Sequence, residues 1–431
     1  MTFQVEEDVN LSNSIPKGQM IPLLCQVLSH QTSGQALGGL LGGLTEDGWS
    51  ELLETARQQG GSGLLYGRLK DLGGKVVVPE MVMEVLHEGV LTSATRNMLM
   101  LHAAGDILGA LKAQGLGVIG LKGLYLVENV YRDISLRTFS DLDLLVHKND
   151  LDAVIACMQG LGYALETYYS SQDVNRDIKH APPMSKPGGP YVEVHWTILE
   201  EDEPFTIDVG GLWERTVPAR IAGVDGLALG VEDLLLHLCV HLGYQHHLKI
   251  GLRGLYDVAE VLRHFRGQVD WKKVTEIARQ WGVERVIWLV LKLAEELLGA
   301  EVPQDVYGRL VGEKVPENVL ADARVQLLAG DGQGVAMTPD LARLATTPGV
   351  GGKLRVMLSR VFLSRQVLAR LYNMSPKSPA IIGCYFRRFK DLVKQYGPSL
   401  KPVLSKDKAV MAGVADEEVR ERLKEWMGKQ K

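Results

Sequence analysis

The sequence predicts an α+β protein in which a small mixed β-sheet core is flanked by helical regions on its N-terminal and C-terminal sides. Apolar residues recur at helical spacing before about residue 110 and again after residue 230. Between these parts, short apolar or alternating runs typical of strands are separated by helical segments. With 431 residues, of which 46% are hydrophobic and 23% charged, the chain is long enough for more than one folded unit.

Four regions follow from these patterns. We expect a helical N-terminal region over residues 1–95, an α/β core over 96–230, a helical domain over 231–330 and a basic helical region over 331–431. From Lys353 onward, 18 Lys and Arg stand against 7 Asp and Glu, a local excess of +11 in a chain whose net charge is -5. The C-terminal region is therefore the basic part of an otherwise acidic chain.

The core is predicted to alternate strands with helices. Residues 118–121 and 142–146 are short apolar runs, and residues 191–198 alternate between apolar and polar side chains, so each is predicted to be a strand. Helical spacing predicts helices over residues 123–131 and 151–161.

Helical patterns return after Gly230. They cover residues 231–242, 252–265, 283–298 and 358–372. Gly- and Pro-rich stretches at 330–339 and 375–380 are predicted to be connections.

Two acidic residues enter the strand at residues 142–146. Because successive side chains of a strand point to opposite faces, Asp141 and Asp143 share one face, while Leu142 and Leu144 point into the core. Neighbouring carboxylates repel each other unless a cation neutralises them, and a divalent cation that prefers oxygen ligands would do so. The alternative is a water-exposed pair at the end of a strand.

A third carboxylate lies on the strand predicted over residues 191–198. Glu193 stands between two valines and shares a face with His195. If the two acidic strands are neighbours, Asp141, Asp143 and Glu193 form a site that can hold two metal ions. One ion would activate an acceptor oxygen, and the other would bind a triphosphate and stabilise the departing pyrophosphate.

The turn between the first strand and its helix is a candidate phosphate site. Lys122 supplies a positive charge beside the free NH groups of a helix start, and Gly123 has no side chain to block a close approach. Arg137 lies four residues before Asp141 and could reach a triphosphate or a carboxylate. For Arg137, a plain salt bridge is the alternative.

Polar residues recur along one side of the apolar helix at 231–242, among them His237 and His241. Their spacing occurs in zinc sites, but neither the Glu of an HExxH motif nor a clear third ligand accompanies them, so zinc is not expected. Either this stripe faces the surface or it lines an active-site cleft, where Asp257 could join it.

Near the C-terminus, aromatic and basic residues are interleaved. One interpretation is an amphipathic helix that packs Phe386 and Phe389 and leaves Arg387, Arg388 and Lys390 in water. The other is a phosphate-tracking surface for a polyanion such as RNA.

No part of the sequence indicates a membrane or secreted protein. No stretch approaches the ~20 uncharged apolar residues of a membrane-spanning helix, and the acidic N-terminus does not have the pattern of a secretion signal. The four cysteines lie far apart without a CxxC pair. A cytoplasmic protein without membrane contact is therefore expected.

Together these motifs resemble the uncharacterised nucleotidyltransferase-like family found in bacteria, which is related to the polymerase-beta-type nucleotidyltransferase superfamily. The resemblance covers roughly residues 95–265. It rests on residues 121–123, 137–146, 160–163 and 192–196.

The resemblance implies a metal-dependent enzyme that moves an NMP group from an NTP such as ATP to an acceptor hydroxyl and releases pyrophosphate. It implies that Asp141, Asp143 and Glu193 bind Mg²⁺ or Mn²⁺ and are catalytic, and that Lys122 and Gly123 contact the nucleotide. It also implies that the helical domain closes over the nucleotide, with His195, His237 and His241 as further candidates for lining the cleft.

The resemblance leaves the acceptor open among a protein, a peptide, an RNA and a small molecule. In one respect the chain departs from the wider superfamily, which usually carries a Gly-Ser pair shortly before its Asp-x-Asp, whereas no such pair occurs here. Two alternatives therefore stand beside the enzyme: a catalytically degenerate accessory protein that binds nucleotide or metal, and a helical interaction protein.

Overall fold

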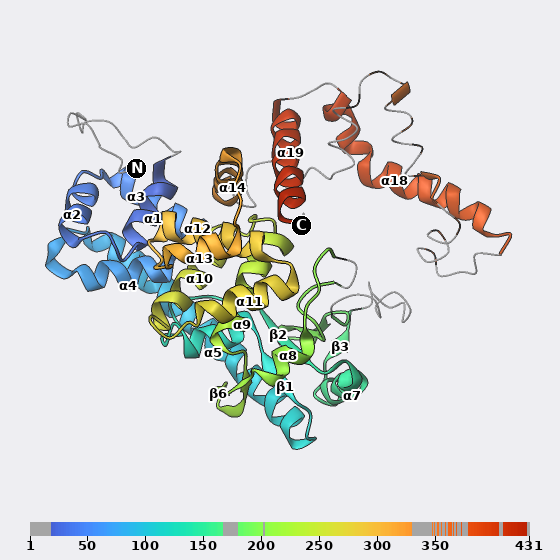
Figure 1. The fold of residues 1–431 in the computed structure, drawn as a ribbon, viewed down its shortest axis with the longest axis horizontal. Coiled ribbons are helices and arrows are strands. Elements are labelled where there is room, and N and C mark those ends of the chain that lie inside the picture. Colours follow the sequence, from blue (N-terminus) through green and yellow to red (C-terminus); the bar gives the residue numbers. More distant parts are fainter. Residues whose placement is uncertain are drawn as a thin grey trace.

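The chain folds into an N-terminal group of helices, a mixed β-sheet and a second group of helices (Figure 1). The computed structural model describes residues 19–166, 180–200, 203–329, 378–404 and 408–428, with scattered residues between 347 and 372. The connection predicted at 330–339 lies outside the described residues, as do most of the helix predicted at 358–372 and part of the connection predicted at 375–380.

The N-terminal helices pack against the later part of the chain as well as against one another. Helix α1 contacts α3 and α4, and it also contacts α12 (Glu284–Leu298) of the second helical group. The long helix α5 runs without a break through residues 95 and 96, where the sequence predicts a boundary between regions. The bounds are α1 (Met20–Leu28), α2 (Gly34–Gly42), α3 (Glu46–Gln58), α4 (Ser62–Leu72) and α5 (Glu80–Ala113).

Within the described residues, the sheet has seven strands in the order β3-β4-β5-β2-β1-β7-β6. It is mixed, because β2 runs parallel to β5 but antiparallel to β1, and β1 runs parallel to β7. The bounds are β1 (Val118–Gly120), β2 (Asp141–Val146), β3 (Ala164–Leu165), β4 (Met184–Ser185), β5 (Tyr191–His195), β6 (Val217–Ile221) and β7 (Val224–Ala228). Helices α6 (Lys122–Asn129), α7 (Leu151–Gly160) and α8 (Val209–Glu214) lie between strands along the chain.

Strand β2 is central and covered on both faces. Leu142, Leu144, Leu145 and Val146 are all fully or almost fully buried, although adjacent residues point to opposite sides. Helices α5 and α6 both pack against β2. A carboxylate in this strand, such as Asp143, therefore lies in the interior rather than at a water-exposed strand end.

The second helical group follows the sheet. Helices α9 to α13 pack together, and α19 packs on α14 and α12, whereas α18 extends away from the rest (Figure 1). The bounds are α9 (Val231–Val240), η5 (His241–Gln245), α10 (Leu252–His264), α11 (Trp271–Trp281), α12 (Glu284–Leu298), α13 (Gln304–Leu310), α14 (Glu317–Ala329), α18 (Ile381–Leu404) and α19 (Lys408–Gly428). Among the described helices, none combines the length and the apolar character that a membrane crossing requires.

The predicted α+β class, with a mixed sheet between helical flanks, is confirmed. The strands predicted at 118–121, 142–146 and 191–198 correspond to β1, β2 and β5, and β5 ends at His195. The sequence prediction omits the β6–β7 hairpin. Pro218 and Gly226 within its strands disfavour β-structure, so the local sequence carries little strand signal there.

The loop that leads from α6 into β2 is held by the N-terminal helices. Asn97 on α5 is fully buried, and its Nδ2 donates to the backbone oxygens of Ile134 at 2.5 Å and Arg137 at 2.7 Å. Gly63 on α4 lies so close to the loop that a Cβ there would stand 2.5 Å from the backbone oxygen of Leu136. Helices α4 and α5 thus set the position from which β2 and its acidic residues begin.

This close approach yields a stability prediction. Gly63→Ala should destabilise the protein by about 1–3 kcal/mol, because the new Cβ meets backbone atoms that cannot rotate away. The matched control is Gly89→Ala within α5, where no atom lies within 4 Å of an added Cβ. That control should stabilise the protein by about 0.8–1.0 kcal/mol through helix propensity.

Urea-induced unfolding, followed by circular dichroism, measures both variants. If Gly63→Ala stabilises the protein as much as Gly89→Ala does, the packing of α4 on the loop is not as described.

Candidate active site

The two acidic strands are neighbours, and their register places the predicted carboxylates together. In the parallel pair β2–β5, Asp143 lies opposite Glu193, and Asp141 lies opposite Tyr191. Since side chains two residues apart share a face, Asp141, Asp143, Glu193 and His195 all point to the same side of the sheet. The two acidic strands therefore pair, as a three-carboxylate site requires.

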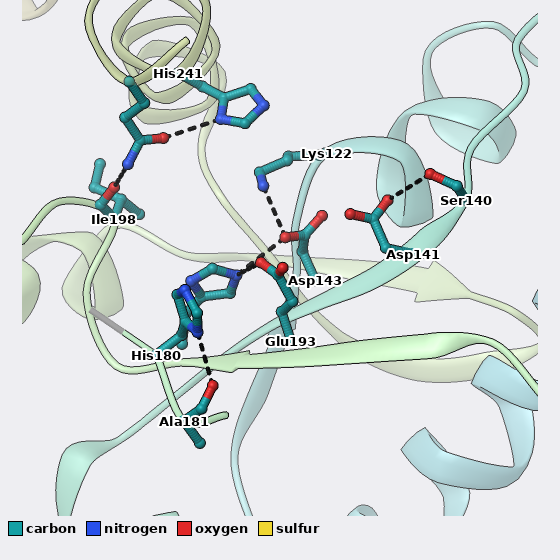
Figure 2. A network of polar contacts seen from close by, with 11 residues as sticks. Lys122, Ser140, Asp141, Asp143, His180, Ala181, Glu193, Ile198 and His241 are labelled. Carbon is teal, nitrogen blue, oxygen red and sulfur yellow. Dashed lines mark hydrogen bonds and ion pairs between the residues drawn. The ribbon is translucent and has the colours of Figure 1, made fainter. Parts of the chain in front are cut away.

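Asp143 is the centre of a compact polar network. Its Oδ1 accepts a hydrogen bond from the Lys122 ammonium at 2.7 Å and another from Nε2 of His195 at 3.0 Å. The same Nε2 lies 3.3 Å from Oε2 of Glu193. Figure 2 shows the side chains of Lys122, Asp143 and Glu193 converging, with the Asp141 carboxylate turned toward that of Asp143. The side chain of Asp143 is 3% exposed and that of Glu193 is 29% exposed, so the network has one open side.

The electrostatic environment differs among the three carboxylates. Burial opposes the charge of Asp143, but the Lys122 ammonium and the hydrogen bond from His195 outweigh it and lower the pKa of Asp143. The hydrogen bond from His195 also lowers the pKa of Glu193. By contrast, burial and then the negative charge of Asp143 raise the pKa of Asp141.

The chemistry of these donors fits a divalent cation. One atom each from Asp143, Glu193 and His195 lie within 4.8 Å of one another, which is a spacing that an ion could bridge. Both neighbours of His195 Nε2 are carboxylate oxygens, which only accept hydrogen bonds. That nitrogen therefore carries a hydrogen and is not available as a metal ligand. The oxygens of Asp143 and Glu193, with Asp141 beside them, are the ligand type that Mg²⁺ and Mn²⁺ prefer.

The turn before α6 has an unusual backbone. Lys122 adopts a positive φ of 46°, which is uncommon for a residue with a side chain. A Cβ on Gly123 would stand 2.5 Å from Nη1 of Arg137 and 2.6 Å from Cβ of Phe139. Glycine is therefore required here by protein packing, in addition to any approach of a phosphate.

A cavity of about 330 Å³ opens over this network. Its walls come from the sheet side and from helices α9 and α10 with the segment between them, so the second helical group covers the acidic strands. The polar lining residues are Lys122, Arg137, Thr138, Ser140, Asp141, Asp143, His180, Glu193, His241, His246, Arg253 and Asp257.

Arg137 is bound within the protein rather than free for a ligand. Its Nε and Nη2 donate to the two carboxylate oxygens of Asp257 at 2.6 and 2.7 Å, and both side chains are buried. Burial disfavours its charge, but the Asp257 carboxylate outweighs burial and raises the pKa of Arg137. The structure thus has the salt bridge that the sequence left as one of two alternatives, with Asp257 as partner.

Arg253 supplies a positive charge that is not among the predicted site residues. It lies four residues before Asp257 on α10 and lines the same cavity. Partial desolvation, and then the positive charge of Arg137, lower the pKa of Arg253. No ion pair joins it to a carboxylate of the part of the chain that the structure describes.

The two histidines of the predicted stripe have different surroundings. His241 lines the cavity, whereas His237 is buried and is absent from the described lining. Nδ1 of His241 lies 2.9 Å from Oε1 of Gln245, which can only accept, so this nitrogen carries the proton. Gln245 in turn donates to the backbone oxygen of Ile198, which ties η5 to the segment after β5.

Asp233 and Tyr244, which stand at helical spacing from these two histidines in the sequence, are engaged inside the protein. Asp233 is buried and accepts two hydrogen bonds from Arg215, both at 2.8 Å. The hydroxyl of Tyr244 donates to Glu203 at 2.6 Å. The stripe is therefore neither a plain solvent face nor a continuous cleft wall.

The basic C-terminal helix does not pack in the way that the amphipathic interpretation expects. On α18, Phe386 is 77% exposed and Phe389 is 56% exposed. The side chains that pack are instead Ile381 and Cys384. A role for this helix in binding a polyanion stays a prediction.

Of the predicted site residues, only His237 lies away from the cavity lining and the network beneath it. Local sequence could have indicated Arg253, since it stands one helical turn from Asp257 on the same face. For His180 and His246 the sequence has no comparable signal. His246 follows a π-helical turn, so regular helical spacing does not predict its position.

No curated protein and no solved structure matches the chain. A family model matches residues 45–299, which is wider than the range of about 95–265 on which the resemblance rests and which takes in helices α3 to α12. Because this match covers more than half of the 431 residues, the chain belongs to that family, described as uncharacterised nucleotidyltransferase.

Proposed function

We propose that the protein is a metal-dependent nucleotidyltransferase that moves an NMP group from an NTP to an acceptor hydroxyl and releases pyrophosphate. The observation that carries the proposal is the pairing of Asp143 with Glu193 across β2 and β5 beneath a cavity that also holds Asp141 and Lys122. Family membership supports the same reaction class.

In this proposal Asp143, Glu193 and Asp141 hold Mg²⁺ or Mn²⁺ through their oxygens. A bound divalent cation would polarise the acceptor oxygen and neutralise charge on the triphosphate. His195 positions the ligands, because its Nε2 donates to Oδ1 of Asp143 and lies 3.3 Å from Oε2 of Glu193, so that it stands between the two carboxylates.

The transfer itself forms one bond and breaks one. The acceptor oxygen bonds to the α-phosphorus, the bond from that phosphorus to the oxygen leading to the β-phosphate breaks, and pyrophosphate leaves with the electron pair. The hydroxyl proton passes to a base, a role that a carboxylate lining the cavity can take. Lys122 and Arg253 are the cations placed to offset the negative charge of the triphosphate.

A family member without the Gly-Ser pair needs another source of phosphate contacts. Here the cavity offers Lys122 at the start of α6 and Arg253 near the start of α10. Since Arg137 is already neutralised by Asp257, Arg253 is the guanidinium of the described lining that remains to pair with an anion.

Transfer of label from a nucleotide tests the proposed reaction. With an α-phosphate-labelled NTP and Mn²⁺, the wild-type protein should release pyrophosphate and transfer label to a hydroxyl-bearing fraction of a cell extract. Asp143→Asn and Glu193→Gln should each lower the rate at least about 100-fold, since a lost metal ligand removes several kcal/mol of transition-state stabilisation.

The matched control is Asp152→Asn, which alters an exposed carboxylate on α7 and should leave the rate unchanged. If Asp143→Asn transfers label as fast as wild type, the assignment of the site is wrong. If nucleotide binds with Mn²⁺ but pyrophosphate never forms with any acceptor fraction, the accessory-protein alternative is favoured instead.

Nucleotide binding tests the proposed role of Arg253. Arg253→Ala should weaken the binding of a non-hydrolysable NTP about 10-fold or more, because a charge-assisted hydrogen bond contributes roughly 1.5–3 kcal/mol. Binding of the corresponding NMP should change much less, since it lacks the distal phosphates. Calorimetry in the presence of Mn²⁺ measures both affinities.

For this experiment Arg220→Ala is the control, because Arg220 is exposed and paired with Asp225 on the β6–β7 hairpin. An equal loss of affinity for NTP and NMP in Arg253→Ala would contradict a role at the distal phosphates.

A further inference from the structure

We propose that Lys122 is an internal counter-ion that competes with the divalent cation for Asp143 and shifts to the triphosphate when nucleotide binds. This inference rests on the proposed function and adds a form of regulation to it. Metal and triphosphate would then each favour the binding of the other, and metal alone would bind weakly.

The geometry places an ammonium where a metal would be held. Nζ of Lys122 lies 2.7 Å from Oδ1 of Asp143, and His195 Nε2 lies 3.0 Å from that same oxygen. One carboxylate oxygen thus already has two donors. A divalent cation bound by Asp143 and Glu193 would meet the positive charge of Lys122 at close range, so metal binding requires the ammonium to move.

Without ligands, the ammonium offsets an otherwise costly charge. The Asp143 carboxylate is 3% exposed and lies across from the Glu193 carboxylate in the β2–β5 register. A buried carboxylate beside a second one is unfavourable unless a cation neutralises it. Lys122 therefore stabilises the site in the form that contains no metal, and this stabilisation is what a metal must replace.

The surroundings of Lys122 allow its ammonium to move into the cavity. Its side chain is 15% exposed, and it lines the cavity together with Arg253 and His246. The positive φ of 46° sets the direction of the side chain at the start of α6, while the flexible four-carbon stem allows Nζ to change partners. Arg137, in contrast, is held by two hydrogen bonds to Asp257.

This exchange makes binding reciprocal. A triphosphate that attracts Lys122 away from Asp143 frees an oxygen for the metal, and a metal that displaces Lys122 frees a cation for the triphosphate. Linkage requires both effects to have the same magnitude.

The test measures Mn²⁺ binding to the full chain by calorimetry at pH 8, without nucleotide. Lys122→Met should bind Mn²⁺ about 5–150-fold more tightly than wild type, which is the usual range of such couplings. Lys122→Asn should behave in the same way, and it guards against misfolding because Asn tolerates a positive φ. Lys122→Arg keeps the charge and should bind Mn²⁺ as weakly as wild type.

A second titration, with a non-hydrolysable NTP at saturating Mn²⁺, should show weaker triphosphate binding in Lys122→Met than in wild type. Lys272→Met is the matched control for both titrations, since Lys272 is exposed on α11. Thermal unfolding confirms that each variant is folded.

The inference is overturned if the two neutral variants bind Mn²⁺ no more tightly than wild type while wild type still transfers label. If neither wild type nor the neutral variants bind Mn²⁺, with or without NTP, the metal-dependent function fails together with the inference. The two failures are therefore distinguishable.

Discussion

The buried carboxylate of Asp257 joins the second helical group to the segment that leads into the acidic strand. It accepts both hydrogen bonds of the Arg137 guanidinium and a third, at 2.8 Å, from the hydroxyl of Tyr131. Removing one partner of such a buried pair typically costs about 3–5 kcal/mol, because the other charge is left unpaired. The position of α10 relative to the sheet therefore depends on this contact.

The same contact organises the cavity from both sides. Arg137 is also held through its backbone oxygen by Asn97 on α5, so a single residue connects the N-terminal helices, the loop before β2 and helix α10. Arg253 stands one turn before Asp257 and is carried to the cavity by the same helix. One ion pair thus links the helix that carries a cation of the cavity wall to the loop that leads into the strand of Asp141 and Asp143.

A feature of the site could be predicted from the sequence where a local pattern of residues specifies it. Asp141 and Asp143 were predictable because strand alternation alone places them on one face, and Glu193 because it stands in a second alternating strand. The pairing of those strands is set by the whole sheet, so sequence could state it only as a condition. The partner of Arg137 lies 120 residues away on α10, a contact that no local pattern specifies.

Two differences between the predicted and the observed elements also arise where local sequence patterns do not determine the structure. The β6–β7 hairpin escaped prediction because its strands contain Pro218 and Gly226, and it is stabilised by pairing rather than by local preference. Regular helical spacing fails after Val240, where the helix widens into the π-helical turn η5 and displaces the residues that follow. Sequence spacing therefore related His237 to His241 but not His241 to His246, although the latter two rings are 4.4 Å apart.

The register of β2 against β5 is the strictest requirement that the proposed chemistry places on the fold. A slip of one residue would move Glu193 and His195 to the opposite face, and Val192 and Val194 would replace them beside Asp143. The slip would expose two valines to the polar cavity and bury a carboxylate and an imidazole in an apolar layer, so hydrophobic burial itself opposes it. The apolar residues that alternate with the site residues thus hold the carboxylates in line, and the core of the sheet and the geometry of the site are specified by the same strands.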